Sequence, residues 1–147
     1  YYHDEIGYNY RMGGLEGASL QVKLKYLPEW NARRQAIAAR YINEIKNDCV
    51  KMQHQPEWAQ SVFHLFVVTV DNRDHFMKYL NDHSIFPALH YPVPCHLQKA
   101  YAHLGYKKGD CPNAEYLAEH CVSLPMYAEL TDDMVQRVID AVNAYQI

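Results

Sequence analysis

The chain has 147 residues, a formal net charge of −3 and a sequence pI near 6.3. This length suits one domain with a substantial core, and the scattered basic residues provide no electrostatic footprint for nucleic acid or an anionic membrane. No apolar run is long enough to cross a bilayer, and no secretory signal pattern opens the chain. The four cysteines show no Cys-x-x-Cys pairing, so we expect reduced thiols in a cytoplasmic protein.

The N-terminal stretch is predicted to be an irregular arm. It contains Gly7, Gly13 and Gly14 and has neither a helical period nor a clean strand pattern. Asn9 and Arg11 lie two positions apart, so in an extended segment both side chains would point to the same side. The alternative interpretation is an ordered arm that binds no ligand.

Helical periodicity begins after these glycines. Apolar residues at Leu20, Leu24 and Leu27 predict a first helix. Pro28 predicts a kink or a restart in a first turn, because proline lacks the N–H that a helix interior requires. The period then resumes from Trp30 and predicts a long amphipathic helix that ends near Lys46.

Two runs rich in β-branched and aromatic residues predict strands. Residues 62–70 are almost continuously apolar, which indicates a strand buried on both faces, whereas residues 47–60 read as a loop. His64 lies inside the first run and is expected to be a core histidine, not a ligand. Residues 85–89 predict a second strand that delivers His90 at its end.

The C-terminal part predicts three more helices around one short strand. A short helix covers residues 98–104, another begins with Asp110 and Pro112, and residues 122–125 form a strand ended by proline. Thr131 caps the last helix. The residues expected to face inward are Ala114, Leu117, Ala118 and Cys121, and on the last helix Val135, Val138, Ile139 and Val142.

This order of elements predicts the class of fold. Helices alternate with short strands, which is typical of a small α/β layer, α+β-like, with helices packed on a short sheet. No repeat and no change in composition divides the chain, so we expect a single domain over residues 1–147.

The stretch from Leu89 to His96 carries the strongest candidate chemistry. Pro92 and Pro94 restrict the backbone between His90 and His96, so we predict a stiff loop at the end of a strand, where α/β proteins often bind ligands. The interpretation as the wall of a binding site competes with a rigid surface connection that carries two solvated histidines.

No other set of residues supports a catalytic or metal centre. Cys95 and His96 are adjacent, and Cys111, His120 and Cys121 lack a paired set of ligands, so we expect no metal site. The chain contains neither the Gly-x-Ser-x-Gly elbow of many hydrolases nor the spacing of a phosphate-binding loop.

Several short motifs follow one another along the chain. The first is Gly7-x-Asn9-Tyr10-Arg11-Met12, and the longest is His90-Tyr91-Pro92-x-Pro94-x-His96-x-Gln98. The others are Leu104-Gly105-Tyr106, Gly109-Asp110, Pro112-x-Ala114-Glu115 and Leu124-Pro125-Met126-Tyr127.

With these motifs the chain resembles the C-terminal part of the DegT/StrS family, which are nucleotide-sugar aminotransferases that depend on pyridoxal phosphate (PLP). The resemblance covers essentially all 147 residues. It departs from the family pattern at Glu16, where a glutamine is expected, at Cys95 and Cys111, which are often apolar, and at Ala128, which is often proline. None of these departures removes a candidate ligand, and the one at Glu16 leaves the local hydrogen bonding open.

The resemblance implies the C-terminal small domain of a fold-type I homodimer whose active sites lie at the subunit interface. It implies that Asn9 and Arg11 bind the cofactor of the neighbouring subunit, and that His90, Tyr91 and His96 contact the substrate. The lysine that holds PLP would belong to a larger domain absent here, so we expect no catalytic residue in this chain. The implied partners are a sugar nucleotide, an amino donor and a second copy of the chain.

Two alternatives remain open. The chain could be the small domain of a sugar dehydratase from the same family, because such enzymes replace the lysine upstream. It could also be a stand-alone binding or dimerisation module that retains the fold without catalysis. The start at Tyr1 without a methionine favours a fragment of a longer protein. The sequence upstream of Tyr1 would distinguish these readings.

Overall fold

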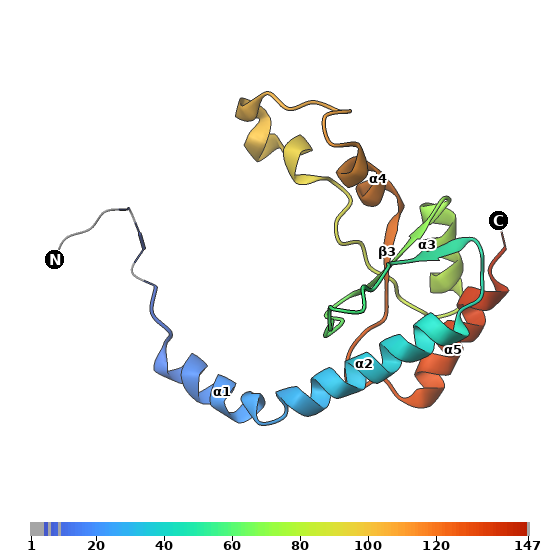
Figure 1. Cartoon of the computed structure of the whole chain (residues 1–147), viewed down its shortest axis with the longest axis horizontal. Helices are drawn as coiled ribbons and strands as arrows, with labels where there is room; N and C mark the ends of the chain where they lie inside the picture. Colours follow the sequence, from blue (N-terminus) through green and yellow to red (C-terminus); the bar gives the residue numbers. More distant parts are fainter. Residues whose placement is uncertain (1–4, 6, 9, 147) are drawn as a thin grey trace.

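Helices and strands are mixed along the chain, and the computed structural model describes residues 5, 7, 8 and 10–146. In Figure 1 the strands and most helices form one body, while the first helix extends away from it toward the N-terminus. None of the described helices combines the length and the apolar content needed to cross a membrane. The elements are α1 (Gly14–Leu24), α2 (Leu27–Glu44), β1 (Val50–Met52), β2 (Phe66–Val70), α3 (Arg73–Asp82), η1 (Cys95–Leu97), η2 (Lys99–Leu104), α4 (Pro112–His120), β3 (Cys121–Leu124) and α5 (Asp132–Ala144), where η marks a 3₁₀ helix.

The three strands form one antiparallel sheet in the order β1, β2, β3. Along the central strand β2, the side chains of Phe66, Val68 and Val70 are buried, and those of Val67 and Thr69 between them are half-buried. Successive side chains point to opposite faces of a strand. The sheet therefore has one fully covered face and one partly open face.

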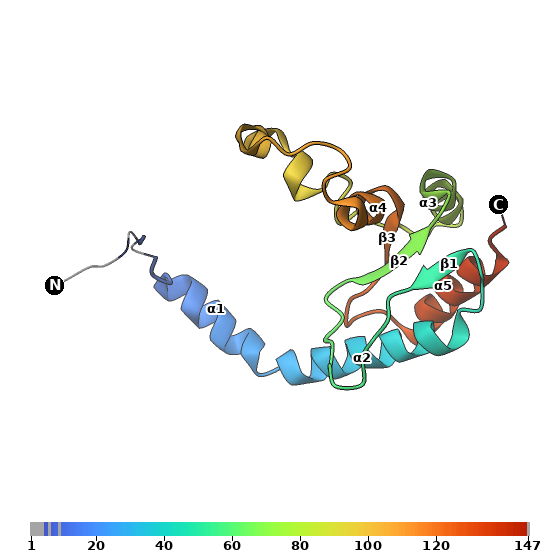
Figure 2. The same ribbon diagram turned by 45° about the horizontal axis from the view of Figure 1, so that its top comes forward.

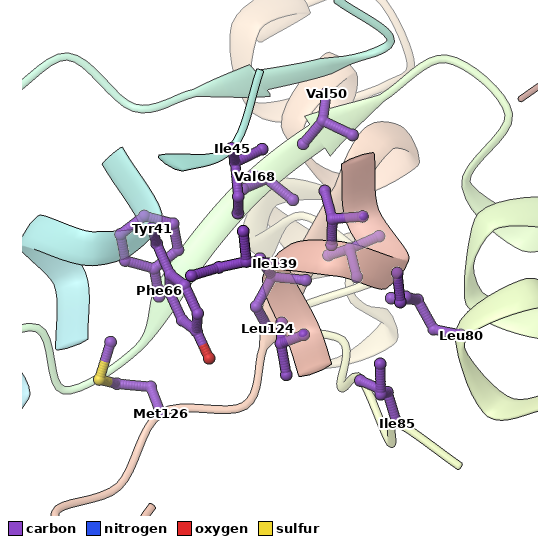
Figure 3. Packing of buried hydrophobic residues seen from close by; sticks show 14 of the residues in the cluster. Tyr41, Ile45, Val50, Phe66, Val68, Leu80, Ile85, Leu124, Met126 and Ile139 are labelled. Atoms are coloured by element: carbon purple, nitrogen blue, oxygen red, sulfur yellow. The ribbon is translucent and has the colours of Figure 1, made fainter. Parts of the chain in front are cut away.

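Helices α2 and α5 lie along the covered face (Figure 2) and form the core with it (Figure 3). Tyr41 of α2 packs edge-on against Phe66, with ring centroids 5.0 Å apart, and its hydroxyl donates to the carbonyl oxygen of Pro125 at 3.0 Å. Burial raises the pKa of the Tyr41 phenol, so it stays a neutral donor. Ile139 of α5, 2% exposed, lies close to both rings in Figure 3.

Two arginines attach the first half of α2 to the segments around α5. Nη2 of Arg33 donates to the carbonyl oxygen of Leu130 at 2.6 Å and to Oδ1 of Asp132 at 2.8 Å. Nη1 of Arg34 donates to the carbonyl oxygen of Met126 at 2.9 Å. These charged donors satisfy carbonyl groups in the connection between β3 and α5, where no strand or helix pairs with them.

The predicted class of fold is confirmed, because helices pack on a short sheet in a mixed arrangement. Pro28 lies in the first turn of α2, as predicted, and α1 and α2 are separate helices. Thr131 caps α5 as predicted, since its hydroxyl accepts from the backbone N–H of Met134 at 3.2 Å. The predicted inward residues of α5 are all buried: Val135, Val138, Ile139 and Val142.

The prediction for His64 is wrong. Strand β2 begins only at Phe66, and His64 is exposed. The chain reaches the sheet through Phe63, whose φ of 48° lies in the left-handed region. Arg34 then binds the carbonyl oxygen of His64 at 3.2 Å, so this part of the apolar run belongs to a loop.

The strand predicted over residues 85–89 is also wrong. The segment makes one isolated bridge, from Ala88 to Ser123, and no continuous ladder. Two physical reasons account for this. The N–H of Ile85 is not available to a strand, because it donates to the carbonyl oxygen of Leu80 at the end of α3, at 2.9 Å. Pro87 has no N–H to donate to a neighbouring strand.

Two further details differ from the prediction. The polar stretch 47–60 contains β1, a strand too short to show a period of its own, which forms by pairing with β2. On α4 the buried residues are Glu115 and Ala118, whereas Ala114 and Leu117 are exposed. The helix is therefore rotated relative to the prediction, and a carboxylate faces inward.

Helix α1 has no buried residue. Leu15 is 90% exposed. Figures 1 and 2 show α1 as a continuation of α2 that leaves the body of the molecule. The apolar side chains exposed along this segment are those of Met12, Leu15, Leu20, Val22 and Leu24.

The core between the sheet and α5 predicts the effect of one substitution. Ile139→Ala should lower the free energy of unfolding by about 2–5 kcal/mol, because it removes buried methyl groups and leaves a cavity. Leu15→Ala, at an exposed position, should change it by no more than about 0.5 kcal/mol. Urea unfolding of the two variants at low protein concentration measures both values. Equal losses in the two variants would contradict this description of the core.

Candidate functional site

His90 is fixed above β3 by two kinds of contact with Ser123. The backbone N–H of Ala88 donates to the carbonyl oxygen of Ser123 at 3.0 Å, and the backbone N–H of Ser123 donates to the carbonyl oxygen of Ala88 at 2.8 Å. Nδ1 of His90 lies 2.8 Å from Oγ of Ser123. The ring of Tyr91 meets the imidazole edge-on, with centroids 5.3 Å apart. The half-buried His90 ring is therefore held in one orientation.

The His90 side chain borders a cavity of about 310 Å³ on the partly open face of the sheet. Val67 and Thr69 of β2 and Lys51 of β1 contribute to one side, and Tyr116 of α4 to another. A cavity of this size is at the lower end of the range for small-molecule sites. Its polar groups include an imidazole, a hydroxyl, a phenol, an ammonium group and the amide of Gln53, which suit a ligand rich in oxygen atoms.

The loop that begins at His90 is held at its far end by Glu115. Nε2 of His96 lies 3.0 Å from Oε1 of Glu115, and the His96 side chain is 9% exposed. The same carboxylate accepts from the backbone N–H groups of Gly109, at 2.8 and 3.0 Å, and Cys111, at 3.3 Å. One buried carboxylate thus joins η1, the turn before α4 and the first turn of α4.

The environment of Glu115 acts on its pKa in two opposite directions. Burial of the carboxyl group favours the neutral form and raises the pKa. The hydrogen bonds from Gly109, His96 and Cys111 favour the carboxylate, and together they outweigh burial, so the net pKa is lowered. Glu115 is therefore ionised at neutral pH and acts as a hydrogen-bond acceptor.

The other predicted site residues lie in different surroundings. Tyr91 is 70% exposed beside His90. Asn9 lies outside the described residues. Arg11 is exposed on the N-terminal arm, which Figures 1 and 2 show extending away from the three-stranded sheet. The structure brings His90 and Tyr91 together, places His96 against Glu115, and does not bring Arg11 to the His90 cavity.

The two polar residues that hold the histidines were not predicted from the sequence. Ser123 is a polar residue inside a short apolar strand, and this pattern was a readable signal. Glu115 occupies the first turn of α4, where an acidic residue is also common for its favourable interaction with the helix dipole. Its role could not be distinguished from that ordinary one without the positions of His96 and Gly109.

The lysines bear on whether this chain could hold PLP by itself. All eight lysines of the sequence are exposed. Lys51 borders the His90 cavity, but its ammonium group lies 3.6 Å from Oδ1 of Asp71 at the surface. A Schiff-base lysine is activated by desolvation or by a nearby cation. None of the eight lysines is desolvated in the structure.

Comparisons with known proteins agree on one family. The model of the DegT/DnrJ/EryC1/StrS aminotransferase family matches residues 1–143. The erythromycin biosynthesis sensory transduction protein EryC1 of Saccharopolyspora erythraea is 40% identical over 145 residues, which are 98% of this chain and 40% of EryC1. The dTDP-3-amino-3,6-dideoxy-α-D-galactopyranose transaminase of Aneurinibacillus thermoaerophilus is 39% identical over 139 residues, which are 95% of this chain and 38% of that enzyme.

A solved structure shows the same fold. DesV of S. venezuelae, crystallised in complex with a ketimine intermediate, superimposes with a TM-score of 0.89 and 35% sequence identity. The match covers 97% of this chain and 39% of DesV. The chain therefore spans about 40% of the length of the relatives it matches.

The lowered pKa of Glu115 predicts a dependence of stability on pH. Stability from a carboxyl group with a lowered folded-state pKa is present above its unfolded pKa, about 4.3 for glutamate, and is lost as pH falls through the folded pKa. We expect Glu115→Gln to lower the melting temperature at pH 7, and to weaken the fall in melting temperature between pH 5 and pH 3. Thermal unfolding followed by circular dichroism measures both effects.

Glu119→Gln is the matched control, because Glu119 lies on the same helix and makes a surface ion pair with Lys108 at 3.2 Å. Exposed pairs of this kind contribute little to stability. This variant should keep the melting temperature of the parent chain. If Glu115→Gln behaved in the same way, the assigned role of the buried carboxylate would be wrong.

Proposed function

This chain belongs to the DegT/DnrJ/EryC1/StrS aminotransferase family, and we propose that it is the C-terminal small domain of a PLP-dependent aminotransferase acting on a keto-sugar nucleotide. One observation carries the proposal: nearly the whole chain matches relatives named as nucleotide-sugar transaminases, at up to 39% identity, and it also superimposes on DesV, crystallised with a ketimine intermediate. The fold by itself would not be sufficient, because one fold can host several activities.

In this proposal the amine that holds the cofactor comes from outside these 147 residues. The exposed setting of all eight lysines and the span of about 40% of the relatives' length both support this division. When bound, PLP supplies the electron sink of the reaction. The part played by this chain is to orient the substrate and to complete the walls of the site.

His90 and Tyr91 are the proposed substrate contacts. Their rings lie together, and His90 borders a cavity that also presents a lysine, a threonine and a tyrosine. His96 was predicted as a third contact. Because its side chain is 9% exposed and hydrogen-bonded to Glu115, we propose that His96 serves the substrate site by holding the loop in place.

The N-terminal arm is proposed to complete the cofactor site of a second copy of the chain. The amide of Asn9 and the guanidinium of Arg11 are donors that suit a phosphate dianion. The described part of the arm extends away from the sheet of its own chain in both views of the molecule, which supports a contact made across a subunit interface (Figures 1 and 2).

The exposed apolar residues of α1 support a homodimer. Large apolar side chains left exposed in number on one segment commonly mark an interface. We expect light scattering of the purified chain to give a mass above that of the monomer, and Leu20→Glu to shift it toward the monomer. Phe86→Glu, at another exposed apolar position, should leave the mass unchanged. A wild-type chain that stays monomeric at all accessible concentrations would contradict the proposed interface.

The proposed function is tested by locating the amine. The complete protein that contains these residues should transfer an amino group to a keto-sugar nucleotide. Borohydride reduction in the presence of PLP should then label a lysine outside residues 1–147, as mapped by mass spectrometry. The 147-residue chain alone should show no stoichiometric label, because an isolated charged contact of about 1.5–3 kcal/mol cannot reach even millimolar affinity, which needs about 4 kcal/mol.

Two outcomes would contradict the proposal. Stoichiometric labelling of one lysine in the isolated chain, Lys51 being the nearest to the cavity, would mean that the chain carries its own nucleophile. Failure of the complete protein to transfer an amino group, with no lysine labelled, would favour a dehydratase or a non-catalytic module.

A further inference from the structure

Ser123 places a hydroxyl group at a position that would otherwise suit an apolar side chain. It is 4% exposed in the middle of β3, between Val122 and Leu124, which are buried in the core. Burying a hydroxyl group costs free energy unless it is hydrogen-bonded. In the described part of the chain, the one side-chain hydrogen bond of Ser123 is the contact of Oγ with Nδ1 of His90.

The position of Ser123 in the sheet explains why it reaches His90. Ser123 pairs with Val67 of β2, and both lie on the face that carries the cavity. Its backbone N–H and carbonyl oxygen bind Ala88, two residues before His90. One residue of β3 therefore fixes both the backbone that leads to His90 and the imidazole ring itself.

The hydrogen-bonding capacity of a serine decides the direction of this bond. A hydroxyl group has one hydrogen to donate. If the Ser123 hydroxyl accepted a hydrogen bond from Nδ1–H, its own hydrogen would be buried with no acceptor among the described residues, which is unfavourable. The hydroxyl therefore donates to Nδ1. In the neutral ring, the proton then lies on Nε2.

We propose that Ser123 is a positioning residue that holds neutral His90 in the Nε2–H tautomer, so that His90 presents a hydrogen-bond donor to an oxygen atom of the substrate. Nε2 of His90 has no hydrogen-bond partner in the described part of the chain, and it is the ring nitrogen left for a ligand. That the ligand is a sugar nucleotide rests on the proposed function. The tautomer rests on the geometry of Ser123 alone.

The consequence is that His90 binds and does not act as a base. A neutral imidazole with the proton on Nε2 cannot accept another proton there, whereas it can donate to a sugar hydroxyl, a carbonyl or a phosphate oxygen. The ammonium of Lys51 and the hydroxyl of Thr69, which border the same cavity, are also donors. This set of donors favours the oxygen-rich part of a substrate.

Nitrogen NMR of the full 147-residue chain tests the proposal directly. Two-bond correlations between the ring nitrogens and ring carbon-bound protons of a ¹⁵N-labelled sample identify the protonated nitrogen, at about pH 8.5, where ordinary histidines are neutral. We expect His90 to show an unprotonated Nδ1 and a protonated Nε2. The signals are assigned by their loss in His90→Gln.

The chain contains controls of the opposite kind. Nδ1 of His83 lies 2.8 Å from the carbonyl oxygen of Tyr79, and Nδ1 of His120 lies 2.8 Å from that of Tyr116. A carbonyl oxygen only accepts, so both rings should carry a proton on Nδ1. A spectrum in which His90 matches these two histidines would overturn the proposal.

Variants of Ser123 test whether the hydroxyl is the cause. In Ser123→Ala, the His90 nitrogen shifts should move to the tautomer average of exposed His54, while Ser123→Thr should retain the parental shifts. Unchanged shifts in Ser123→Ala would contradict the positioning role. If Ser123→Ala does not fold, the parental spectrum still decides the tautomer. None of these measurements uses a substrate, so failure of the proposed function would leave their outcome unaffected.

Discussion

The packing of α2 and α5 against one face of the three-stranded sheet is the constraint on which the rest of the structure depends. Phe66, Val68 and Val70 of β2 point into this core, so the alternation of a strand directs Val67 and Thr69 to the opposite face. That face carries the His90 cavity. Burial on one side of the sheet thus determines which side chains are available for binding on the other.

Two buried polar residues hold the proline-rich loop of the candidate site, one at each end. Ser123 fixes His90 where the loop begins, and Glu115 fixes His96 further along it. Each polar group is satisfied, which is the condition under which a buried polar contact gives a unique arrangement without a large cost. The loop therefore needs little packing of its own to hold a defined position.

Local signals in the sequence predicted the parts of the fold that depend on local physics. The period of α5, the cap at Thr131 and the restart at Pro28 follow from neighbours a few residues apart, and all three are confirmed. The failures at His64 and at residues 85–89 have one cause: an apolar run shows that a segment is buried, but not where its ladder begins or ends. Here the left-handed backbone of Phe63 precedes the start of the β2 ladder, and Pro87, which lacks an N–H, limits its segment to an isolated bridge.

The candidate site was also predictable only in its local features. The prolines indicated that His90 and His96 stand on a stiff loop. The partners of these histidines are 33 and 19 residues away along the chain, and no local pattern contains that information. The association of this site with amino transfer came from the resemblance to a family, since neither the composition nor the spacing of residues specifies the reaction.

The claim that His90 belongs to the substrate site is tested most directly by steady-state kinetics of the complete protein, proposed to be an aminotransferase, with His90→Ala. The variant should raise KM or lower kcat for the keto-sugar nucleotide by at least tenfold, which corresponds to about 1.4 kcal/mol. It should still fold, with a lower melting temperature because the buried Ser123 hydroxyl loses its partner, whereas the control His54→Ala at an exposed loop position should keep the parental melting temperature. Equal kinetic constants in His90→Ala and the parent enzyme would contradict the account.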